Sequence, residues 1–193
     1  METLLKVVAQ LLIVQNLGLV PSVVCSFPQE ICKMIFPKGA IVRMGVELTP
    51  SQVKDAPQVG WQAKNSEFYT LTMIDPDAPR REDPVLRDWL HWLVVNIPGN
   101  NIGEGEVLAE YIGAAPPKGT GLHRYVILIY QQLEKITCDE TKIDSNTAQG
   151  RENFRIKKFG KKYKLHQPVA GNVFIAQWDK YVEKLHEKLK LNI

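Results

Sequence analysis

The chain has 193 residues, of which 45% are hydrophobic and 23% are charged, and its formal net charge at pH 7 is +3. This length predicts one well-filled core, because two such cores need a longer chain. The small net charge gives no general argument for binding to nucleic acid or to an acidic membrane. No apolar run approaches the roughly 20 residues that cross a bilayer as a helix.

Residues 1–18 form an apolar segment ahead of a single domain that we predict for residues 19–193. The apolar positions repeat with the period of an amphipathic helix, and those on one side are Leu4, Val7, Val8, Leu11 and Leu12. The same block, followed by small residues near Cys25 and Ser26, also has features of a secretion signal. We expect an uncleaved helix and a cytoplasmic protein. The alternative is a signal peptide and a secreted protein.

Short β-rich runs alternate along the chain with turns rich in proline and glycine. These runs cover residues 40–46, 68–74, 89–97, 122–130 and 173–178. The links between them mostly lack the crossover helices of a parallel sheet, so the fold class is mainly β, an antiparallel β-sandwich with short flanking helices. We expect one helix within residues 153–164. A C-terminal helix should run from Asp179, as its N-cap, to about Lys190.

Three cysteines, Cys25, Cys32 and Cys138, are too few for a disulfide framework. Three reduced thiols fit a cytosolic protein. A bridge between Cys25 and Cys32 belongs to the secretory alternative.

Three titratable side chains lie at the ends of predicted strands, beside stiff turns. Asp75 ends one run, and His91 and His123 come near the starts of two others. Strict alternation of side chains puts His91 on the same face as Leu93, and His123 on the same face as Tyr125. If these strand ends meet in space, they predict a small site of mixed charge.

Such a site suits an anion. A nearby carboxylate favours the imidazolium form of histidine, and the backbone N–H groups of residues 118–121 could complete an anion trap. The prolines at 116 and 117 would keep this loop in shape before a ligand arrives. Asp75 or Asp77 could then meet the cationic end of a zwitterion such as an ethanolamine headgroup.

Competing chemistries fit the sequence less well. The chain has no G-x-S-x-G nucleophile elbow, and the run KGT at 118–120 has its lysine before the glycine, unlike a P-loop. No H-x-H or H-x-x-x-H pair supports zinc. The basic run at 151–164 is interpreted as a solvated helix face rather than a nucleic-acid surface. We therefore expect no enzyme, metal or cofactor, and a weak hydrolase that uses the same residues ranks last.

Blocks of this sequence resemble the phosphatidylethanolamine-binding proteins, a family that includes the Raf kinase inhibitor protein, and are most similar to its insect-like animal members. The blocks are DPDAP at 75–79, WLHWLVVNIPG at 89–99 and PPKGTGLHRY at 116–125, and the match continues from about Leu19 to the C-terminal helix. The resemblance implies a Greek-key β-sandwich with an anion pocket at one end. Carried over by position, the ligand-binding residues would be Asp75, Trp89, His91, Ala115, Pro116, Pro117, Gly121, His123, Tyr125 and His186.

Four other features qualify this resemblance. Arg124 points to the opposite strand face from His123, so we expect it to support loops rather than touch a ligand. Leu86, Ala115 and His186 stand where the family often has an aromatic residue, a glycine and a tyrosine, respectively. These departures leave anion binding as the expectation and bear on the choice of headgroup.

The resemblance also implies a function. We expect a non-enzymatic, monomeric binding module for a phospholipid headgroup or a phosphorylated side chain, which modulates kinase signalling. Its expected partners are such a phosphate-bearing ligand and a protein kinase, with peripheral membrane contact and no nucleic acid. The alternative is a secreted lipid or odorant carrier, or a protein similar to a serine protease inhibitor.

Overall fold

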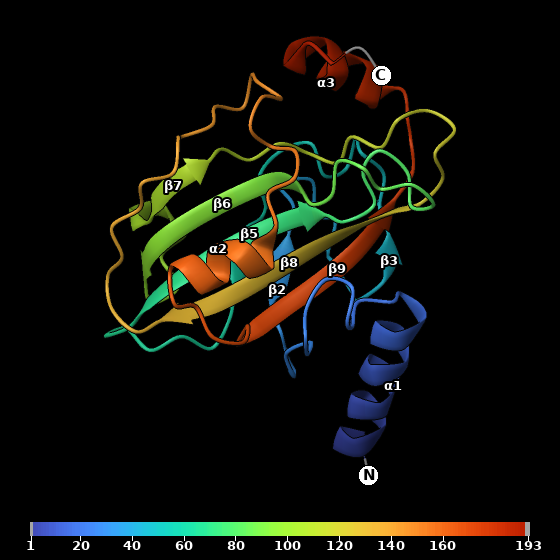
Figure 1. The fold of residues 1–193 in the computed structure, drawn as a ribbon. Helices are drawn as coiled ribbons and strands as arrows, with labels where there is room; N and C mark the ends of the chain where they lie inside the picture. The colour runs from blue at the N-terminus through green and yellow to red at the C-terminus, as the bar shows by residue number, and fades with distance from the viewer. Residues whose placement is uncertain (1, 192–193) are drawn as a thin grey trace.

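A mixed seven-stranded sheet forms the centre of the protein in the computed structural model, which describes residues 2–191 (Figure 1). Across this sheet the strand order is β1-β9-β8-β5-β6-β7, and β3 also pairs with β9. Its strands are β1 (Glu30–Ile31), β3 (Val46–Glu47), β5 (Phe68–Asp75), β6 (Trp89–Pro98), β7 (Glu106–Ala109), β8 (His123–Gln132) and β9 (Ala170–Ala176). A second, two-stranded sheet consists of β2 (Lys33–Ile35) and β4 (Gln58–Gly60).

The helical elements are α1 (Glu2–Asn16), the 3₁₀ turn η1 (Ile102–Glu104), α2 (Ile156–Lys162) and α3 (Tyr181–Leu189). Both α2 and α3 lie within the ranges predicted for them. The N-cap of α3 is Lys180 rather than the expected Asp179. The carboxylate of Asp179 nevertheless accepts a hydrogen bond from the backbone N–H of Tyr181 at 2.9 Å, so it still stabilises the start of the helix.

The sequence predicts an antiparallel sheet, but the large sheet is mixed. Both β1 and β3 run parallel to β9, with Glu30 opposite Ala170 and Val46 opposite Phe174. Parallel pairing needs a long connection between the two strands, and most of the domain lies between β3 and β9 in the chain. The Greek-key connection of the strands stays a prediction.

The prediction of a strand over residues 40–46 is wrong, because most of this range is not in a strand. Ile41 makes only an isolated bridge to Ile35, and β3 begins at Val46. Gly45 has a φ of 77°, so the backbone leaves the extended conformation just before β3. The other four predicted runs correspond to β5, β6, β8 and β9.

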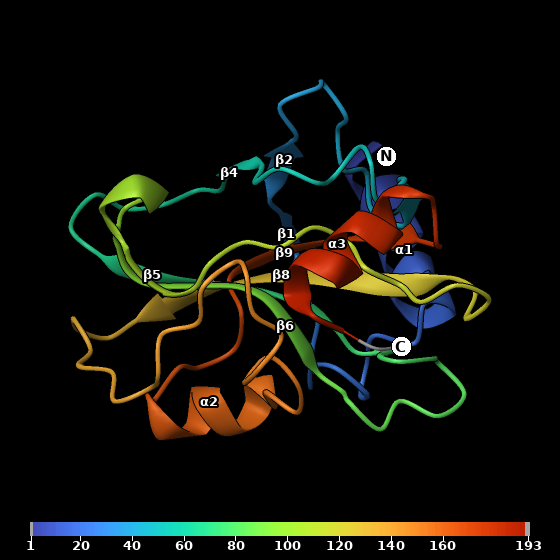
Figure 2. The same cartoon turned by 90° about the horizontal axis from the view of Figure 1, so that it is seen from above.

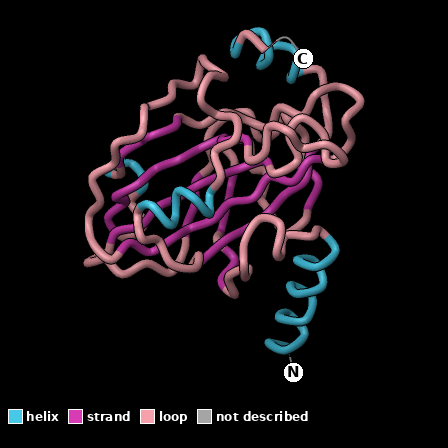
Figure 3. The backbone as a smooth tube through the Cα atoms, viewed as in Figure 1, coloured by secondary structure: helices cyan, strands magenta, loops and turns pink. Residues whose placement is uncertain are grey.

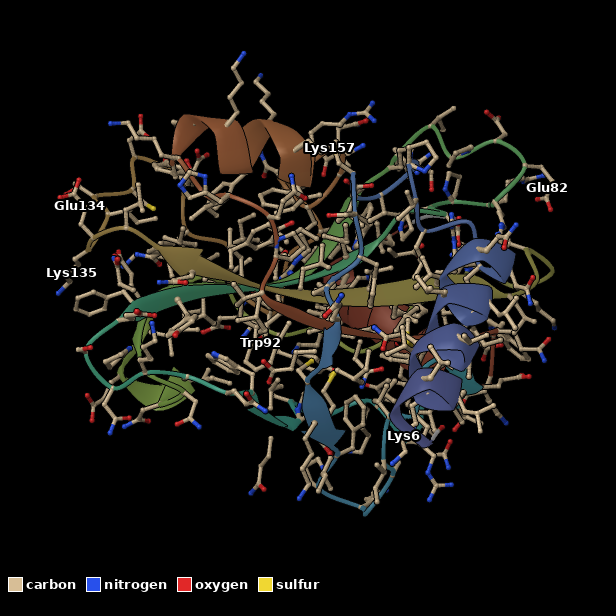
Figure 4. All side chains as sticks on the ribbon, turned by 90° about the horizontal axis from the view of Figure 1, so that it is seen from below. Lys6, Glu82, Trp92, Glu134, Lys135 and Lys157 are labelled. Atoms are coloured by element: carbon tan, nitrogen blue, oxygen red, sulfur yellow. The ribbon has the colours of Figure 1, made fainter. Side chains whose placement is uncertain are left out.

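Apolar cores lie on both faces of the large sheet. One packs between the sheet and the β2–β4 pair, and includes Met34, Val59 and Trp92. The other lies beneath α2 and includes Ile74 and Phe159. Figure 2 shows α2 and the β2–β4 pair on opposite sides of the sheet, and Figure 4 shows Trp92 on the side of β2. The sheet is therefore buried on both faces, which explains its near-continuous apolar strands.

A β-bulge in β6 decides which way His91 points. Met73 pairs with Trp92, but the next residue of β5, Ile74, pairs with Leu90. His91 is therefore an extra residue without an opposite partner on β5. Such an insertion interrupts the alternation of side chains along the strand.

The bulge overturns the predicted face of His91. Leu90 and Leu93 lie in the same core, whereas strict alternation placed them on opposite faces. His91 does not share a face with Leu93, as predicted, but packs edge-on against the ring of Tyr125, which belongs to the opposite core. The predicted alternation in β8 is confirmed, because Tyr125 and Ile127 lie together in that core.

Helix α1 extends from the body of the domain (Figure 1). Several of its apolar side chains are exposed. Val14, near its end, is buried, whereas Leu4 and Leu5 are 68% and 66% exposed. The chain that follows α1 enters the core, where Leu19 and Val23 are buried. In the described part of the chain no helix has the length and apolar character needed to cross a membrane.

Strands β9 and β8 lie so close at Gly171 that a larger residue at this position should destabilise the protein. A Cβ atom added at Gly171 would lie 2.9 Å from the carbonyl oxygen of Ile127 and 3.1 Å from the Cγ atom of Pro28. We expect Gly171→Ala to lower the free energy of unfolding by about 1–3 kcal/mol, because backbone must shift to relieve the clash. Gly60→Ala, in β4 with no atom within 4 Å of its Cβ position, is the matched control and should change stability little. Equal urea midpoints for the two variants would contradict this packing.

Candidate functional site

The end of one strand and the starts of its two neighbours lie side by side at one end of the large sheet, where the loops gather (Figure 3). Strand β5 lies between β6 and β8 and is antiparallel to both, so its end lies beside their starts. These are the positions of Asp75, His91 and His123. The structure therefore brings together the three titratable side chains that the sequence placed at strand ends.

Hydrogen bonds hold His123 at both ring nitrogens. Its Nδ1 lies 2.7 Å from Oδ2 of Asp75, and its Nε2 lies 2.8 Å from Oγ1 of Thr120. The Thr120 hydroxyl donates its own proton to the carbonyl oxygen of Pro117, so it must accept a proton from the imidazole. An imidazolium that donates from both nitrogens satisfies these contacts and forms an ion pair with Asp75.

The protonation of this pair follows from its surroundings. Burial lowers the pKa of His123, but the hydrogen bond to Asp75 and the charge of that carboxylate outweigh burial and raise the pKa above the ordinary value of 6.5. Burial raises the pKa of Asp75, and its hydrogen bond with His123 opposes this rise. The backbone N–H of Asp77 also donates to Oδ1 of Asp75 at 2.7 Å. Although the pKa of Asp75 is raised, its carboxylate accepts from His123 and from Asp77, and this geometry favours an imidazolium beside a carboxylate.

His91 has the opposite electrostatic character. Its side chain is buried, and its Nδ1 donates to the carbonyl oxygen of Ile112 at 3.2 Å. Burial lowers the pKa of His91 to about 3, so the ring is neutral near pH 7. A neutral ring with its proton on Nδ1 carries a lone pair on Nε2. The predicted anion trap therefore contains one imidazolium and one neutral imidazole.

A cavity of about 20 Å³ lies among these side chains, enough for about one water molecule. Six of the predicted ligand-binding residues line it, namely Asp75, Trp89, His91, Ala115, Pro117 and His123. The lining also includes four residues that were not predicted as ligand-binding, namely Ala78, Pro79, Leu86 and Leu191.

The other four predicted residues, Pro116, Gly121, Tyr125 and His186, do not line the cavity. Pro116 is buried and Gly121 is exposed. The Tyr125 hydroxyl accepts a hydrogen bond from the N–H of Ala115 at 3.3 Å, and its ring centroid is 5.1 Å from that of His91. His186 reaches the rim from α3, with Nε2 at 3.0 Å from the carbonyl oxygen of Ala115. Tyr125 and His186 therefore brace the pocket wall.

The C-terminal segment forms part of the cavity wall. Leu185 and Leu189 of α3 join Trp89 and Ile112 in one apolar cluster at this end of the sheet. Leu191, just after α3, lines the cavity itself. Figure 1 shows α3 beyond the loops that end the sheet. Because the remaining volume suits a single water molecule, a larger ligand requires this segment or the loops to move.

Arg124 braces the loops around the pocket, as expected. Its guanidinium forms a bidentate ion pair with Asp77, and its Nη1 donates to the carbonyl oxygens of Leu17 and Gly18 at 2.7 and 3.0 Å. Burial raises the pKa of Asp77, but the contacts with Arg124 outweigh it and hold the pKa below its ordinary value. Arg124 itself does not line the cavity. It fixes the chain that follows α1 against the loop that follows β5.

The pocket offers charge, hydrogen bonding and apolar walls. Among residues 2–191, no three His, Cys, Asp or Glu side chains are grouped so that they could hold a metal ion. The cysteines Cys25, Cys32 and Cys138 are free thiols. What the pocket presents is one imidazolium–carboxylate pair, one neutral imidazole acceptor and a rim stiffened by proline.

The two pocket histidines should titrate differently. In NMR spectra that detect the ring nitrogens, we expect His91 to remain neutral between about pH 5 and 8, and His123 to keep its second proton above pH 6.5, its ordinary pKa. Asp75→Asn removes the negative partner and should lower the pKa of His123. A His91 signal that titrates near pH 6.5, or a His123 signal that the Asn substitution leaves unchanged, would contradict these assignments.

The comparisons with known proteins agree with this architecture. The model of the family described as phosphatidylethanolamine-binding protein matches residues 35–174. The chain is 42% identical over 177 residues to putative odorant-binding protein A5 of Drosophila melanogaster. The aligned region covers 92% of this chain and 84% of that protein.

Solved structures give the same result. The solution structure of CG7054 is 44% identical, with a TM-score of 0.73 over 89% of this chain and 97% of that one. Carboxypeptidase Y inhibitor, in a complex with its cognate proteinase, is 27% identical, with a TM-score of 0.75 over 89% of this chain and 96% of that one. The phosphatidylethanolamine-binding protein of Plasmodium vivax, at 21% identity and a TM-score of 0.69 over 86% of this chain and 96% of that one, shares the fold. The match to the family model and the identity to the Drosophila relative show that the chain belongs to the phosphatidylethanolamine-binding protein family.

Proposed function

We propose that the chain is a non-enzymatic binding protein that captures a phosphate-bearing headgroup or a phosphorylated side chain. The observation that carries this proposal is the buried Asp75–His123 ion pair beside the neutral ring of His91, in a cavity with a proline-stiffened rim. These groups converge from three strands on one small volume. In the cell, occupancy of this pocket would change the binding of a protein kinase, as the family resemblance implies.

The phosphate is the recognised group in this proposal, rather than a cationic headgroup. Asp75 is already paired with His123, and Asp77 is paired with Arg124. The ammonium group of a zwitterion would have to displace one of these partners to reach either carboxylate. This changes the interpretation from the sequence, in which Asp75 or Asp77 received the ammonium group.

An anion must bring or recruit a proton to this pocket. The lone pair on Nε2 of His91 repels an anionic oxygen but accepts a hydrogen bond from a P–OH group. A phosphate monoester can supply that group as its monoanion, because its second pKa is about 6. A phosphodiester headgroup lacks it, so His91 would take up a proton instead. In both cases the complex holds a proton that is lost as pH rises, and affinity falls with increasing pH.

Titration of phosphoethanolamine into the full chain, followed by NMR, tests the proposal. Binding should be tighter at about pH 6 than at pH 8, with shifts at His91 and His123. His91→Leu removes the hydrogen-bond acceptor for the P–OH group and cannot take up a proton, so it should weaken binding by about tenfold. His166→Gln changes an exposed histidine outside the pocket and is the matched control. Leu191→Ala should tighten binding because it removes one wall of a cavity that is too small for the ligand.

Two results would overturn the proposal. One is an affinity that is the same at both pH values and in the His91→Leu variant. The other is a set of shifts that lies away from the ends of β5, β6 and β8. Inorganic phosphate, titrated in parallel, separates recognition of the phosphate from recognition of the whole headgroup.

A second candidate function is that of a secreted carrier or an inhibitor of a protease. The names of two relatives favour it, since one is a putative odorant-binding protein and another inhibits carboxypeptidase Y. Secretion would require the removal of an N-terminal signal. Cleavage at Cys25 or Ser26 would remove Leu19 and Val23 from the core. A cleavage that preserves the domain must therefore fall before Val14, which is buried in the same core. Such a cleavage also keeps Leu17, whose carbonyl oxygen accepts from Arg124.

The mass of the intact protein from its native tissue distinguishes the two locations. An uncleaved cytoplasmic protein should begin at or before Leu4 and carry free thiols. A chain that begins between about residues 12 and 14 would support secretion with an intact domain. A chain that begins at Cys25 or Ser26 would contradict the assignment of the preceding residues to the core.

A further inference from the structure

We propose a second ligand site for a small uncharged molecule with an apolar body. It is separate from the cavity that Asp75, His91 and His123 line, which we call the phosphate pocket. The second site is a cavity of about 460 Å³ formed by β6, β7 and the segment at residues 140–154. Leu90 lines it, whereas the next residue, His91, lines the phosphate pocket, so the two cavities lie on opposite sides of β6. This volume is within the range of about 300–1,000 Å³ that is usual for small-molecule sites.

Backbone hydrogen bonds hold one wall of this second cavity in place. The N–H of Ile143 donates to the carbonyl oxygen of Leu108 at 2.8 Å, and the N–H of Glu110 donates to that of Ile143 at 2.9 Å. The segment therefore runs along the free edge of β7, where Ala109 and Ile143 form a parallel bridge. Figure 1 shows this segment passing beside β7 before it reaches α2.

Arg151 fixes the other end of the segment. Its side chain is buried, and its guanidinium donates to the carbonyl oxygens of Thr147, Leu90, Glu110 and Asp144 at 2.8–3.0 Å. One side chain thus ties β6, the chain after β7 and the 140–154 segment together. Because these walls are already fixed, a ligand would lose little free energy in ordering them.

The floor of the cavity is apolar, and its rim carries charges that are already paired. The floor consists of Leu90, Leu93, Leu108, Ile143 and Phe154. At the rim, Lys142 is paired with Glu106 at 3.2 Å, and Glu140 is paired with Lys162 at 2.6 Å. A charged ligand would have to compete with one of these pairs, so the rim favours a ligand without net charge.

The remaining lining groups can bind one oxygen atom of such a ligand. Thr141 and Thr147 contribute hydroxyl groups, and Gln149 contributes an amide. A medium-chain alcohol, aldehyde or ester has the matching chemistry, with an apolar chain for the floor and one oxygen for the rim. This differs from the pocket that Asp75, His91 and His123 line, where the proposed ligand is an anion that brings or recruits a proton.

Fluorescence titration of the full chain with the uncharged probe N-phenylnaphthylamine, followed by displacement with decanol, tests this site. Thr141→Trp fills the cavity from an exposed position and should weaken probe binding by about tenfold. Thr137→Trp places the same side chain at an exposed position just before this segment, outside the lining, and should bind as the wild type does. Saturating phosphoethanolamine should not displace the probe.

A second measurement does not depend on any substitution. In methyl NMR spectra of the wild-type chain, decanol should shift the signals of Leu93 and Leu108. The proposal is overturned if the probe fails to bind, if it binds Thr141→Trp and Thr137→Trp equally, or if decanol leaves both leucine signals in place. Loss of the probe on addition of phosphoethanolamine would also overturn it, because one shared site would then explain both ligands.

Discussion

The ion pair between Asp75 and His123 is the contact on which the ligand end of the molecule depends. Both side chains are buried, and removing either would leave an uncompensated charge, at a cost of about 3–5 kcal/mol. A second pair, Asp77 with Arg124, lies next to it in sequence. Two carboxylates from one turn thus meet two neighbouring cations at the start of β8. One pair borders the cavity, and the other ties the loops to the chain after α1.

The bulge at His91 completes the site. Without it, regular alternation would place this ring in the core beneath α2, on the wrong side of the sheet. With it, the ring lies beside Tyr125 and reaches the same volume as Asp75 and His123. Burial of this imidazole disfavours uptake of a second proton, so the pocket contains two histidines of different charge. Ligand binding and proton binding are therefore linked in the proposed mechanism.

Much of this arrangement could be predicted from the sequence, and the exceptions have physical reasons. The alternation in β8, the positions of α2 and α3 and the loop-bracing role of Arg124 follow from local patterns. The bulge did not, because it depends on pairing between β5 and β6, which one strand's sequence does not reveal. The parallel contacts of β1 and β3 depend on the distant β9. No local pattern marks Leu191, since its place in the lining depends on how α3 docks.

The most direct measurement is a crystal structure of the protein with phosphoethanolamine. We expect a phosphate oxygen within hydrogen-bonding distance of Nε2 of His91, next to the rim at Pro117, with Leu191 displaced from its present position. Phosphate density elsewhere on the molecule, with Leu191 still lining the small cavity, would contradict the assignment of this pocket.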